Sequence, residues 1–343
     1  MQQGESSMNN RTVCTSITAT LCATLAFAST QAIAAKSGGG GSTACTAAVD
    51  FPAFAYWKPG GKTMDILVAD ATGKCVRSVI SSSGTGGTIQ FSYPVSGTTN
   101  RGRVVWVAAP AVVSVDFTVD DLTKQITVFA KKTIYSGTGG FISLSKNGNA
   151  LYSTRYLSAG GLVIDRLELD AVGEPIPNTT SAVFVAPDGS NVQTISVNSA
   201  ETVLFADYKP ISGASPIYQL VYVLLPGGSI TATSVLDFNN SSRELNPAVD
   251  PWSLSNRVAY QRVAATAGSC DLLVTSSDLD PAPVYPLQSA YGMKPTWLKG
   301  KILADGRVAS TRNGCDYTGI IMETDPVSGV QTALTSGYDP DGK

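Results

Sequence analysis

The chain has 343 residues, of which 43% are hydrophobic and 15% charged, and its formal net charge is −2. This composition excludes a disordered chain, and without a basic block it excludes a nucleic-acid site built on clustered Lys and Arg. The sequence contains no histidine, which excludes a Ser-His-Asp triad, a Cys-His pair and a His-ligated zinc site.

Residues 1–35 have the features of a cleaved signal peptide. Arg11 provides a positive n-region, residues 17–28 form an uncharged apolar stretch, and Ala32-Ile33-Ala34 is a small-residue cleavage pattern. The alternative is a transmembrane anchor, but the apolar stretch is shorter than the roughly 18 residues that a span needs. We therefore predict a periplasmic or secreted protein with no transmembrane anchor after cleavage. Residues 36–43 form a flexible Gly/Ser-rich leader.

Cleavage would leave four cysteines, Cys45, Cys75, Cys270 and Cys315. In an oxidising compartment they predict disulfides, and four cysteines allow three pairings. Pairing between sequence neighbours, Cys45 with Cys75 and Cys270 with Cys315, is our first hypothesis, and buried free thiols are the alternative. The absence of a C-x-x-C pair in the sequence argues against a metal site.

Beyond the leader, short apolar segments separated by turn residues predict successive antiparallel strands over 44–343. The first unit has predicted strands at 54–58, 64–70 and 75–80. The second has them at 88–95, 102–109, 112–119 and 124–130, and the third at 141–145, 149–157 and 161–169. The fourth has them at 192–197, 201–208, 217–225 and 229–236.

The last third of the chain contains an internal repeat. Asn246-Pro247, Arg257-Val258-Ala259 and Cys270-Asp271 recur as Lys294-Pro295, Arg307-Val308-Ala309 and Cys315-Asp316, and later matches follow in the same order. The offsets lie between 45 and 50 residues, which is the length of a four-stranded propeller blade. Residues 217–225 are apolar on both faces, as expected of a strand that is covered on both sides. The sequence therefore predicts one all-β domain, a six-bladed β-propeller of four-stranded antiparallel blades. A β-sandwich is the alternative.

The repeat resembles the propeller blades of the TolB family, which are also described as WD40-like. The family pattern of a proline step, an aromatic residue, an Asp-Gly turn and a short strand is matched over 246–260 and 294–309, and the terminal Asp339-Pro340-Asp341-Gly342-Lys343 is similar to its turn. The resemblance covers about 240–343 well and concerns turns, not a site. It implies a periplasmic scaffold that binds proteins. TolB has an additional N-terminal α/β domain, for which we find no equivalent, so a role in the Tol system is not implied.

Candidate chemical sites are few. Asp305-Gly306 and Asp341-Gly342 could suggest calcium loops, but the other EF-hand ligands are missing, and we favour simple turns. The carboxylates Asp116, Asp120 and Asp121, and those of Asp165, Glu168 and Asp170, could serve glycosidase chemistry if they converged. For these groups we favour turns and pairing with Arg155 and Arg166.

The aromatic residues present the same choice between binding and packing. The four tryptophans, Trp57, Trp106, Trp252 and Trp297, could line a binding funnel. Because Trp252 and Trp297 fall at similar repeat positions, we favour packing.

From these residues we predict an exported binding module for a protein or peptide, more a binding protein than an enzyme, with no cofactor and no metal. We expect a monomer that does not bind nucleic acid, and we assign no catalytic residue. The alternative is a carboxylate-dependent enzyme that acts on a carbohydrate or lactone through the propeller channel.

Overall fold

A computed structural model describes residues 45–48, 50–61, 63–82, 88–137, 140–158, 161–186, 190–210, 218–227, 235–237, 242–252, 257–264, 270–275, 285–298, 301–310, 314–325 and 330–342. Its contacts divide the chain into two units, Met1–Thr30 and Gln31–Lys343. All described residues belong to the second unit. The predicted signal peptide and leader lie outside them, and no described helix is long and apolar enough to cross a membrane.

The described residues form an all-β fold of five antiparallel sheets, four of which have four or five strands each. The first is ordered β24 (Tyr338–Gly342), β1 (Phe54–Gly60), β2 (Thr63–Ala69) and β3 (Val76–Ser82). The second is β4 (Ile89–Ser92), β5 (Arg101–Ala108), β6 (Ala111–Val119) and β7 (Ile126–Val128), with β8 (Lys132–Ser136) also paired to β6. The third is β12 (Ser181–Ala186), β11 (Leu162–Glu168), β10 (Ala150–Tyr156) and β9 (Ile142–Leu144). The fourth is β13 (Asn191–Val197), β14 (Val203–Lys209), β15 (Gln219–Leu224) and β16 (Val235–Asp237).

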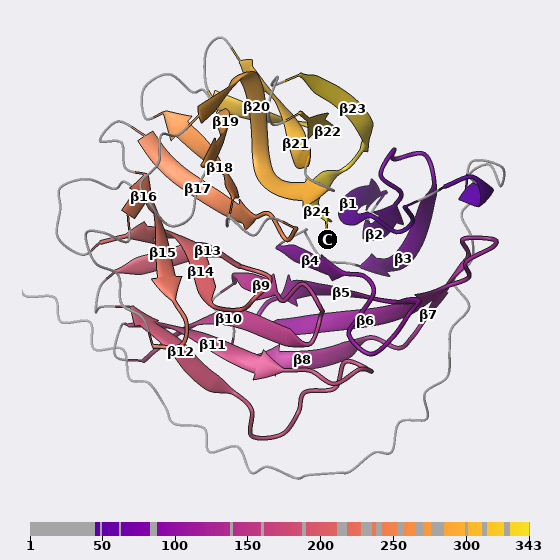
Figure 1. Ribbon diagram of the computed structural model, residues 1–343, viewed down its shortest axis with the longest axis horizontal. Coiled ribbons are helices and arrows are strands. Elements are labelled where there is room, and N and C mark those ends of the chain that lie inside the picture. Colours follow the sequence, from indigo (N-terminus) through magenta and orange to yellow (C-terminus); the bar gives the residue numbers. More distant parts are fainter. Residues whose placement is uncertain are drawn as a thin grey trace, which may run out of the picture. The chain divides into compact units, whose positions relative to one another are not determined.

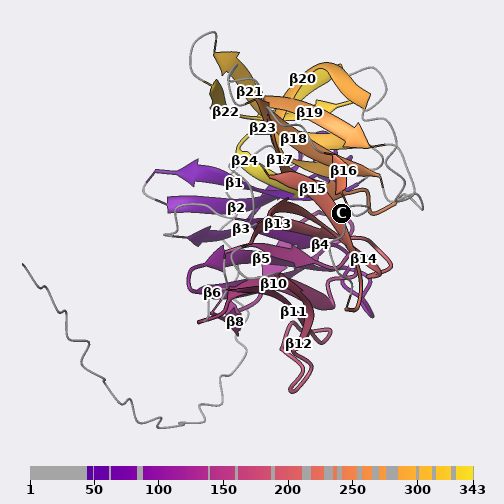
Figure 2. The same cartoon turned by 90° about the vertical axis from the view of Figure 1, so that its left-hand side faces the viewer.

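The fifth sheet has seven strands, from β17 to β23. They are β17 (Ser242–Val249), β18 (Val258–Ala264), β19 (Cys270–Thr275), β20 (Tyr285–Leu298), β21 (Lys301–Ser310), β22 (Gly314–Thr324) and β23 (Gln331–Ser336). In Figure 1 the five sheets follow one another in chain order around a centre near β24 and β4, and Figure 2 shows the same sheets from the side. This is a propeller-like arrangement of small antiparallel sheets.

The number of separate sheets is five, whereas the sequence predicts six blades. The cause is β20, which pairs with β19 through Tyr285, Pro286 and Tyr291 and with β21 through residues from Gly292 to Leu298. This continuous strand joins the two units that carry the predicted repeat. They therefore form one hydrogen-bonded sheet.

The C-terminal segment closes the ring, as the repeat predicts. Asp339-Pro340 falls 45 residues after Lys294-Pro295 and therefore aligns with the opening of another repeat, from which we predict that residues 337–343 run back beside the first unit, 44–81. Strand β24 pairs with β1, with Gly342 opposite Phe54 and Tyr338 opposite Trp57. The first sheet thus combines one strand from the end of the chain with three from its beginning. Edge strands with unpaired backbone groups are avoided at this junction.

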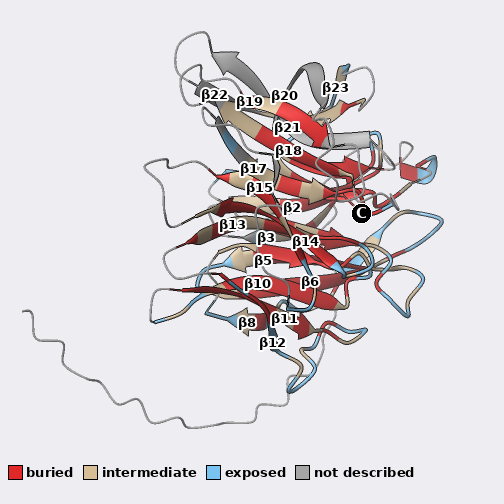
Figure 3. Cartoon of the chain, turned by 60° about the vertical axis from the view of Figure 1, so that its left-hand side comes forward, coloured by how far each residue is buried: buried red, intermediate tan, exposed pale blue. Residues whose placement is uncertain are grey.

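Apolar residues on both faces of the strands pack between neighbouring sheets. Figure 3 shows that most buried residues lie in the strands, whereas exposed residues gather in the turns and at strand ends and edges. Leu220 and Val221 are adjacent in β15, point to opposite faces, and are both fully buried. One apolar cluster joins the first and second sheets, and another joins the third and fourth. Burial on both faces in the middle of β15 confirms the interpretation for the described part of 217–225, whereas Leu224 at the strand end is exposed.

Sequence patterns missed two strands. The fourth strand of the second sheet is split, because β7 pairs with one end of β6 and β8 with the other. Strand β12 completes the third sheet with the pattern Ser-Ala-Val-Phe-Val-Ala, for which the predicted third unit had no counterpart.

Candidate functional site in the central channel

The innermost strands of the sheets enclose one cavity of about 80 Å³. Six segments that are far apart in the sequence contribute to its wall. They belong to β4, β9, β13, β17, β20 and β24, and their lining residues include Gln90, Ile142, Ser196, Ala248, Thr296 and Asp341. We call this cavity the central channel.

A belt of hydrogen bonds joins these strands around the channel. A polar side chain on one inner strand accepts a hydrogen bond from a backbone N–H of the next inner strand. The bonds are Leu144 N to Gln90 Oε1 (3.0 Å), Val197 N to Ser143 Oγ (3.2 Å), Val249 N to Ser196 Oγ (3.1 Å), Gly342 N to Thr296 Oγ1 (2.8 Å) and Phe91 N to Asp341 Oδ2 (2.6 Å).

The sixth position of the belt is Ala248, which has no side-chain acceptor. There the indole Nε1 of Trp297 donates to the carbonyl oxygen of Ala248 at 2.7 Å. Buried backbone groups need such partners, so the belt both fixes the strands and makes the middle of the channel polar. Its six positions recur every 45 to 53 residues.

Four successive inner strands carry a β-bulge two residues before the belt. The register shifts between Val192 and Ile195, between Leu245 and Ala248, between Met293 and Thr296, and in β24 opposite Ala55 and Trp57. In three of these strands the bulge contains an X-Pro step whose first residue has a positive φ, namely 55° at Asn246, 48° at Lys294 and 48° at Asp339. Non-glycine residues rarely adopt this conformation, and bulges of this kind redirect side chains next to functional sites.

Charged groups of the lining lie on two sides of the belt. At the bulges, the Lys294 ammonium contacts the Asp339 carboxylate at 2.5 Å, and the belt itself contains the buried carboxylate of Asp341. Beyond the ends of β9 and β17 lie Lys146 and Pro251. The described lining therefore contains two cations and two anions and offers both hydrogen-bond donors and acceptors.

A buried carboxylate behind the wall supports the bulge of β13. Asp207 in β14 accepts hydrogen bonds from Gln193 N at 3.0 Å and from Thr194 Oγ1 at 2.8 Å, and Thr194 Oγ1 in turn accepts one from Asn246 N at 3.0 Å. Burial raises the pKa of Asp207 to about 7, although the hydrogen bonds from Thr194 and its neighbours act in the opposite direction. Its ionisation is thus coupled to the position of two residues that line the channel, Thr194 and Asn246.

The carboxylates that the sequence offered for catalysis do not converge on the channel. Asp116 is buried in β6 and pairs with Arg103 and Arg101 at 2.8 Å each. Asp120 caps an exposed turn through Leu122 N and Thr123 N, which lowers its pKa. Each of these groups stabilises local structure.

The second carboxylate group is also structural. Asp165 pairs with Arg155 at 2.6 Å, and Arg166 pairs with Glu168 at 2.8 Å, as the sequence suggests. Asp170 caps a turn by accepting hydrogen bonds from Val172 N and Glu174 N. No group of three potential metal ligands is found among the described residues, and the side chain of Asp305 lies outside them.

The two recurring tryptophans differ, contrary to the prediction that both have a packing role. Trp297 is buried, whereas 39% of Trp252 is exposed. Their repeat positions are not equivalent, since Trp297 lies within β20 two residues after its proline and Trp252 lies in a turn five residues after its own. Trp57 and Trp106 pack edge to face in the core.

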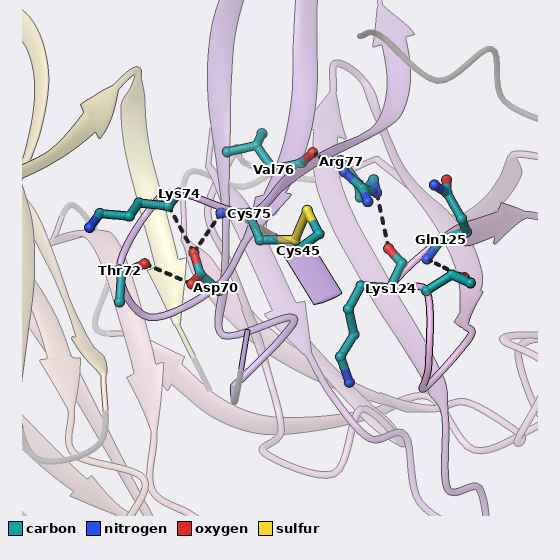
Figure 4. Close-up of a disulfide and its surroundings, with 10 residues drawn as sticks. Cys45, Asp70, Thr72, Lys74, Cys75, Val76, Arg77, Lys124 and Gln125 are labelled. Atoms are coloured by element: carbon teal, nitrogen blue, oxygen red, sulfur yellow. Dashed lines mark hydrogen bonds between the residues drawn. A yellow bond between two sulfur atoms is a disulfide. The ribbon is translucent and has the colours of Figure 1, made fainter. Parts of the chain in front are cut away.

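The Cys45–Cys75 disulfide is present, with a Cα–Cα distance of 4.6 Å. Figure 4 shows it beside Asp70, whose carboxylate accepts hydrogen bonds from Lys74 N and Cys75 N at 2.9 Å each. Cys270 is also disulfide-bonded, and the side chain of Cys315 lies outside the described residues. The Cys45–Cys75 disulfide links the start of the described chain to the first sheet, which β24 completes.

The sequence matches no protein-family model and no curated protein. Among solved structures, the chain is similar to TolB from Acinetobacter baumannii, with a TM-score of 0.57 and 12% identity over 84% of this chain and 65% of that one. It is also similar to the β-propeller domain of the trilobed protease from Pyrococcus furiosus (TM-score 0.47, 12% identity, 83% and 94% covered) and to the Pseudomonas aeruginosa periplasmic gluconolactonase PpgL (0.44, 12%, 84% and 96%). The chain thus spans about two thirds of TolB, and the likeness shows a TolB-like propeller fold.

Proposed function

We propose that the protein is an exported β-propeller binding module whose central channel receives a segment of a partner protein. The observation that carries this proposal is the lining. Each inner strand contributes to the wall of one channel, and five of the six do so with their belt residue, while β9 contributes Ile142. The bulges beside the belt hold three residues in a rarely adopted conformation. Strain of this kind persists where the surrounding structure fixes it for a function.

The proposal includes six blades. The belt has six positions. The first half of β20 pairs with β19 and serves as the outermost strand of one blade, and the second half pairs with β21 and serves as the innermost strand of the next. Each half of the seven-stranded sheet then has four strands, the number in an ordinary propeller blade. The belt periodicity of 45 to 53 residues agrees with this division.

Export is supported by the predicted signal peptide and by the Cys45–Cys75 disulfide, because disulfides persist in oxidising compartments. Fusing residues 1–44 to a reporter that is active only outside the cytoplasm tests this part. We expect activity and a product processed near Ala35 or Lys36. A full-length cytoplasmic product would contradict export.

The lining favours binding over the alternative, carboxylate-dependent catalysis on a carbohydrate or lactone. A glycosidase needs two carboxylates placed on either side of the scissile bond. In the channel, Asp339 is engaged by Lys294, and Asp341 accepts hydrogen bonds from Phe91 N and Thr296 Oγ1. Apolar groups such as Ile195, Pro247 and Val249 share the lining, and an apolar wall with a few polar groups is typical of binding pockets.

Blocking the channel tests the proposal. Ser199 is exposed and lines the channel, whereas the next residue, Ala200, is also exposed and is not part of the lining. We expect Ser199→Trp to abolish capture of partner proteins from a periplasmic extract and Ala200→Trp to leave it unchanged. Equal capture by both variants would overturn the channel as the binding site.

A further inference from the structure

Trp252 differs from the other three tryptophans of the chain. Trp57, Trp106 and Trp297 are each at most 2% exposed, whereas 39% of Trp252 is exposed. Trp252 directly follows Pro251, which lines the channel. Exposed tryptophans next to a pocket are frequent anchor points of protein interfaces.

A lysine from another sheet lies beside this indole. Lys146 follows β9, and its Nζ donates a hydrogen bond to the Pro251 carbonyl oxygen at 2.9 Å and lies 5.8 Å from the centre of the Trp252 ring. Lys146 also lines the channel. One edge of the channel therefore combines an aromatic face with an ammonium group.

The two lysines of the channel wall have different partners. The Lys294 ammonium contacts a carboxylate, that of Asp339. In the part of the chain that the structure describes, no carboxylate lies within ion-pair distance of Lys146, whose recorded hydrogen bond goes to a neutral carbonyl. An ammonium held this way attracts an anionic group, and a charge-assisted hydrogen bond is stronger than a neutral one.

We propose that Trp252 and Lys146 together bind a partner segment in which a carboxylate neighbours an aromatic or large apolar side chain. The apolar side chain packs on the indole, and the carboxylate accepts a hydrogen bond from the Lys146 ammonium. This inference rests on the proposed function, because it assigns the chemistry of the segment that enters the channel at this edge.

Trp252 itself provides the readout. Because the other tryptophans are buried, acrylamide quenching of the full chain reports mainly on Trp252. The probes are N-acetylated glycine-serine hexapeptides with one phenylalanine. In the first, glutamate follows phenylalanine and the C-terminus is amidated; in the second, glutamine replaces glutamate; in the third, phenylalanine is the last residue and carries a free carboxylate. The first and third distinguish a side-chain carboxylate from a chain end.

We expect at least one of the two carboxylate peptides to protect Trp252 from quenching, with an affinity about tenfold higher than that of the glutamine peptide. Lys146→Gln should remove that tenfold preference without lowering the affinity for the glutamine peptide. The control Leu122→Ala, at an exposed turn of the second sheet, should leave all affinities unchanged. Variants that lack Trp252 are measured by calorimetry. Trp252→Phe should retain the preference for the carboxylate peptide, whereas Trp252→Ala should lower the affinity for all peptides about tenfold. Melting curves verify that each variant is folded.

Equal affinities of the glutamate, glutamine and free-carboxylate peptides, or an unchanged preference in Lys146→Gln, would overturn the inference. Protection by trigalacturonate and by no peptide would overturn it in favour of an acidic sugar. The proposed function is judged separately. If partner capture remains sensitive to Ser199→Trp while Lys146→Gln and Trp252→Ala capture normally, the channel binds a partner but this edge is not its contact.

Discussion

Asp341 Oδ2 accepts a hydrogen bond from Phe91 N at 2.6 Å although 250 residues separate the two. Asp341 lies in the closing strand β24 and Phe91 in the first strand of the second sheet, so this bond completes the belt between the C-terminal strand and the second sheet. Both residues are buried. The Asp341 carboxylate therefore adds a side-chain hydrogen bond to the ring closure that the pairing of β24 with β1 provides.

Removing this acceptor should destabilise the fold. Asp341→Ala leaves the buried N–H of Phe91 without a partner, which costs about 1–3 kcal/mol, and we expect the melting temperature to fall by about 2–5 °C. Asp341→Asn retains an acceptor and should lose less than half as much. A melting temperature of Asp341→Ala equal to that of the wild type would show that the belt is not closed in solution.

The buried carboxylate of Asp207 should make stability depend on pH. Burial raises its pKa to about 7 in the folded chain, whereas an unfolded Asp has a pKa of about 3.9. The folded state therefore binds the proton more tightly, so this contribution to stability is complete below about pH 4 and is lost as the pH rises through about 7. Asp207→Asn cannot titrate. Between pH 5 and pH 8 the wild type should lose a few degrees of melting temperature relative to this variant, and a constant difference would contradict the assignment.

The two arginines that pair with Asp116 in the second sheet should contribute unequally to stability. Arg103 is fully buried and pairs with Asp116, and it also donates to the carbonyl oxygen of Asp170, in the turn that follows β11 of the third sheet. Arg103→Met leaves a buried carboxylate poorly paired and should cost about 3–5 kcal/mol. Arg101 also contacts Asp116 but its side chain is 16% exposed, so Arg101→Met should cost about 1 kcal/mol. Urea unfolding measures both, and equal losses would show that burial does not decide the effect.

Loss of the Cys45–Cys75 disulfide should also lower stability. The two cysteines are 30 residues apart, and cross-linking a loop of this size stabilises a fold by about 2–4 kcal/mol. We expect the double variant Cys45→Ser with Cys75→Ser to melt several degrees lower than the wild type in the absence of reductant. Because Cys270 is also disulfide-bonded, reductant should lower the melting temperature of the double variant further. No difference between the oxidised wild type and the double variant would contradict this role.

Sequence patterns predicted the propeller because its determinants repeat locally. The X-Pro steps at Asn246, Lys294 and Asp339 recur every 45 to 48 residues, and each forms the same bulge in an inner strand. The third copy led to the prediction that the C-terminal segment closes the ring, which the pairing of β24 with β1 confirms. The sequence did not reveal that β20 runs without a break from one predicted unit into the next. A turn that would end the strand and a bulge that lets it continue differ by only a few residues, so the pattern does not distinguish them.

The channel was far less visible in the sequence than the fold. Its belt positions include Gln90, Ser143, Thr296 and Asp341, whose common feature is only an acceptor atom. Only serine recurs, at Ser143 and Ser196, so no motif marks the belt, although a search for polar residues directly after each X-Pro step would have found Thr296 and Asp341. Conversely, Asp165 and Glu168 suggested a catalytic site because charged residues cluster there, but both pair with arginines on their own sheet.

Photo-crosslinking from inside the channel tests the central claim most directly. A photoreactive phenylalanine analogue would replace Thr194 or Ser199, which line the channel, and in controls Leu122 or Val185, which are exposed elsewhere. After illumination in intact cells, we predict that the two channel positions yield the same crosslinked partner protein and that the control positions do not. A partner that crosslinks equally from Leu122 and Val185, or none from either channel position, would contradict binding in the channel.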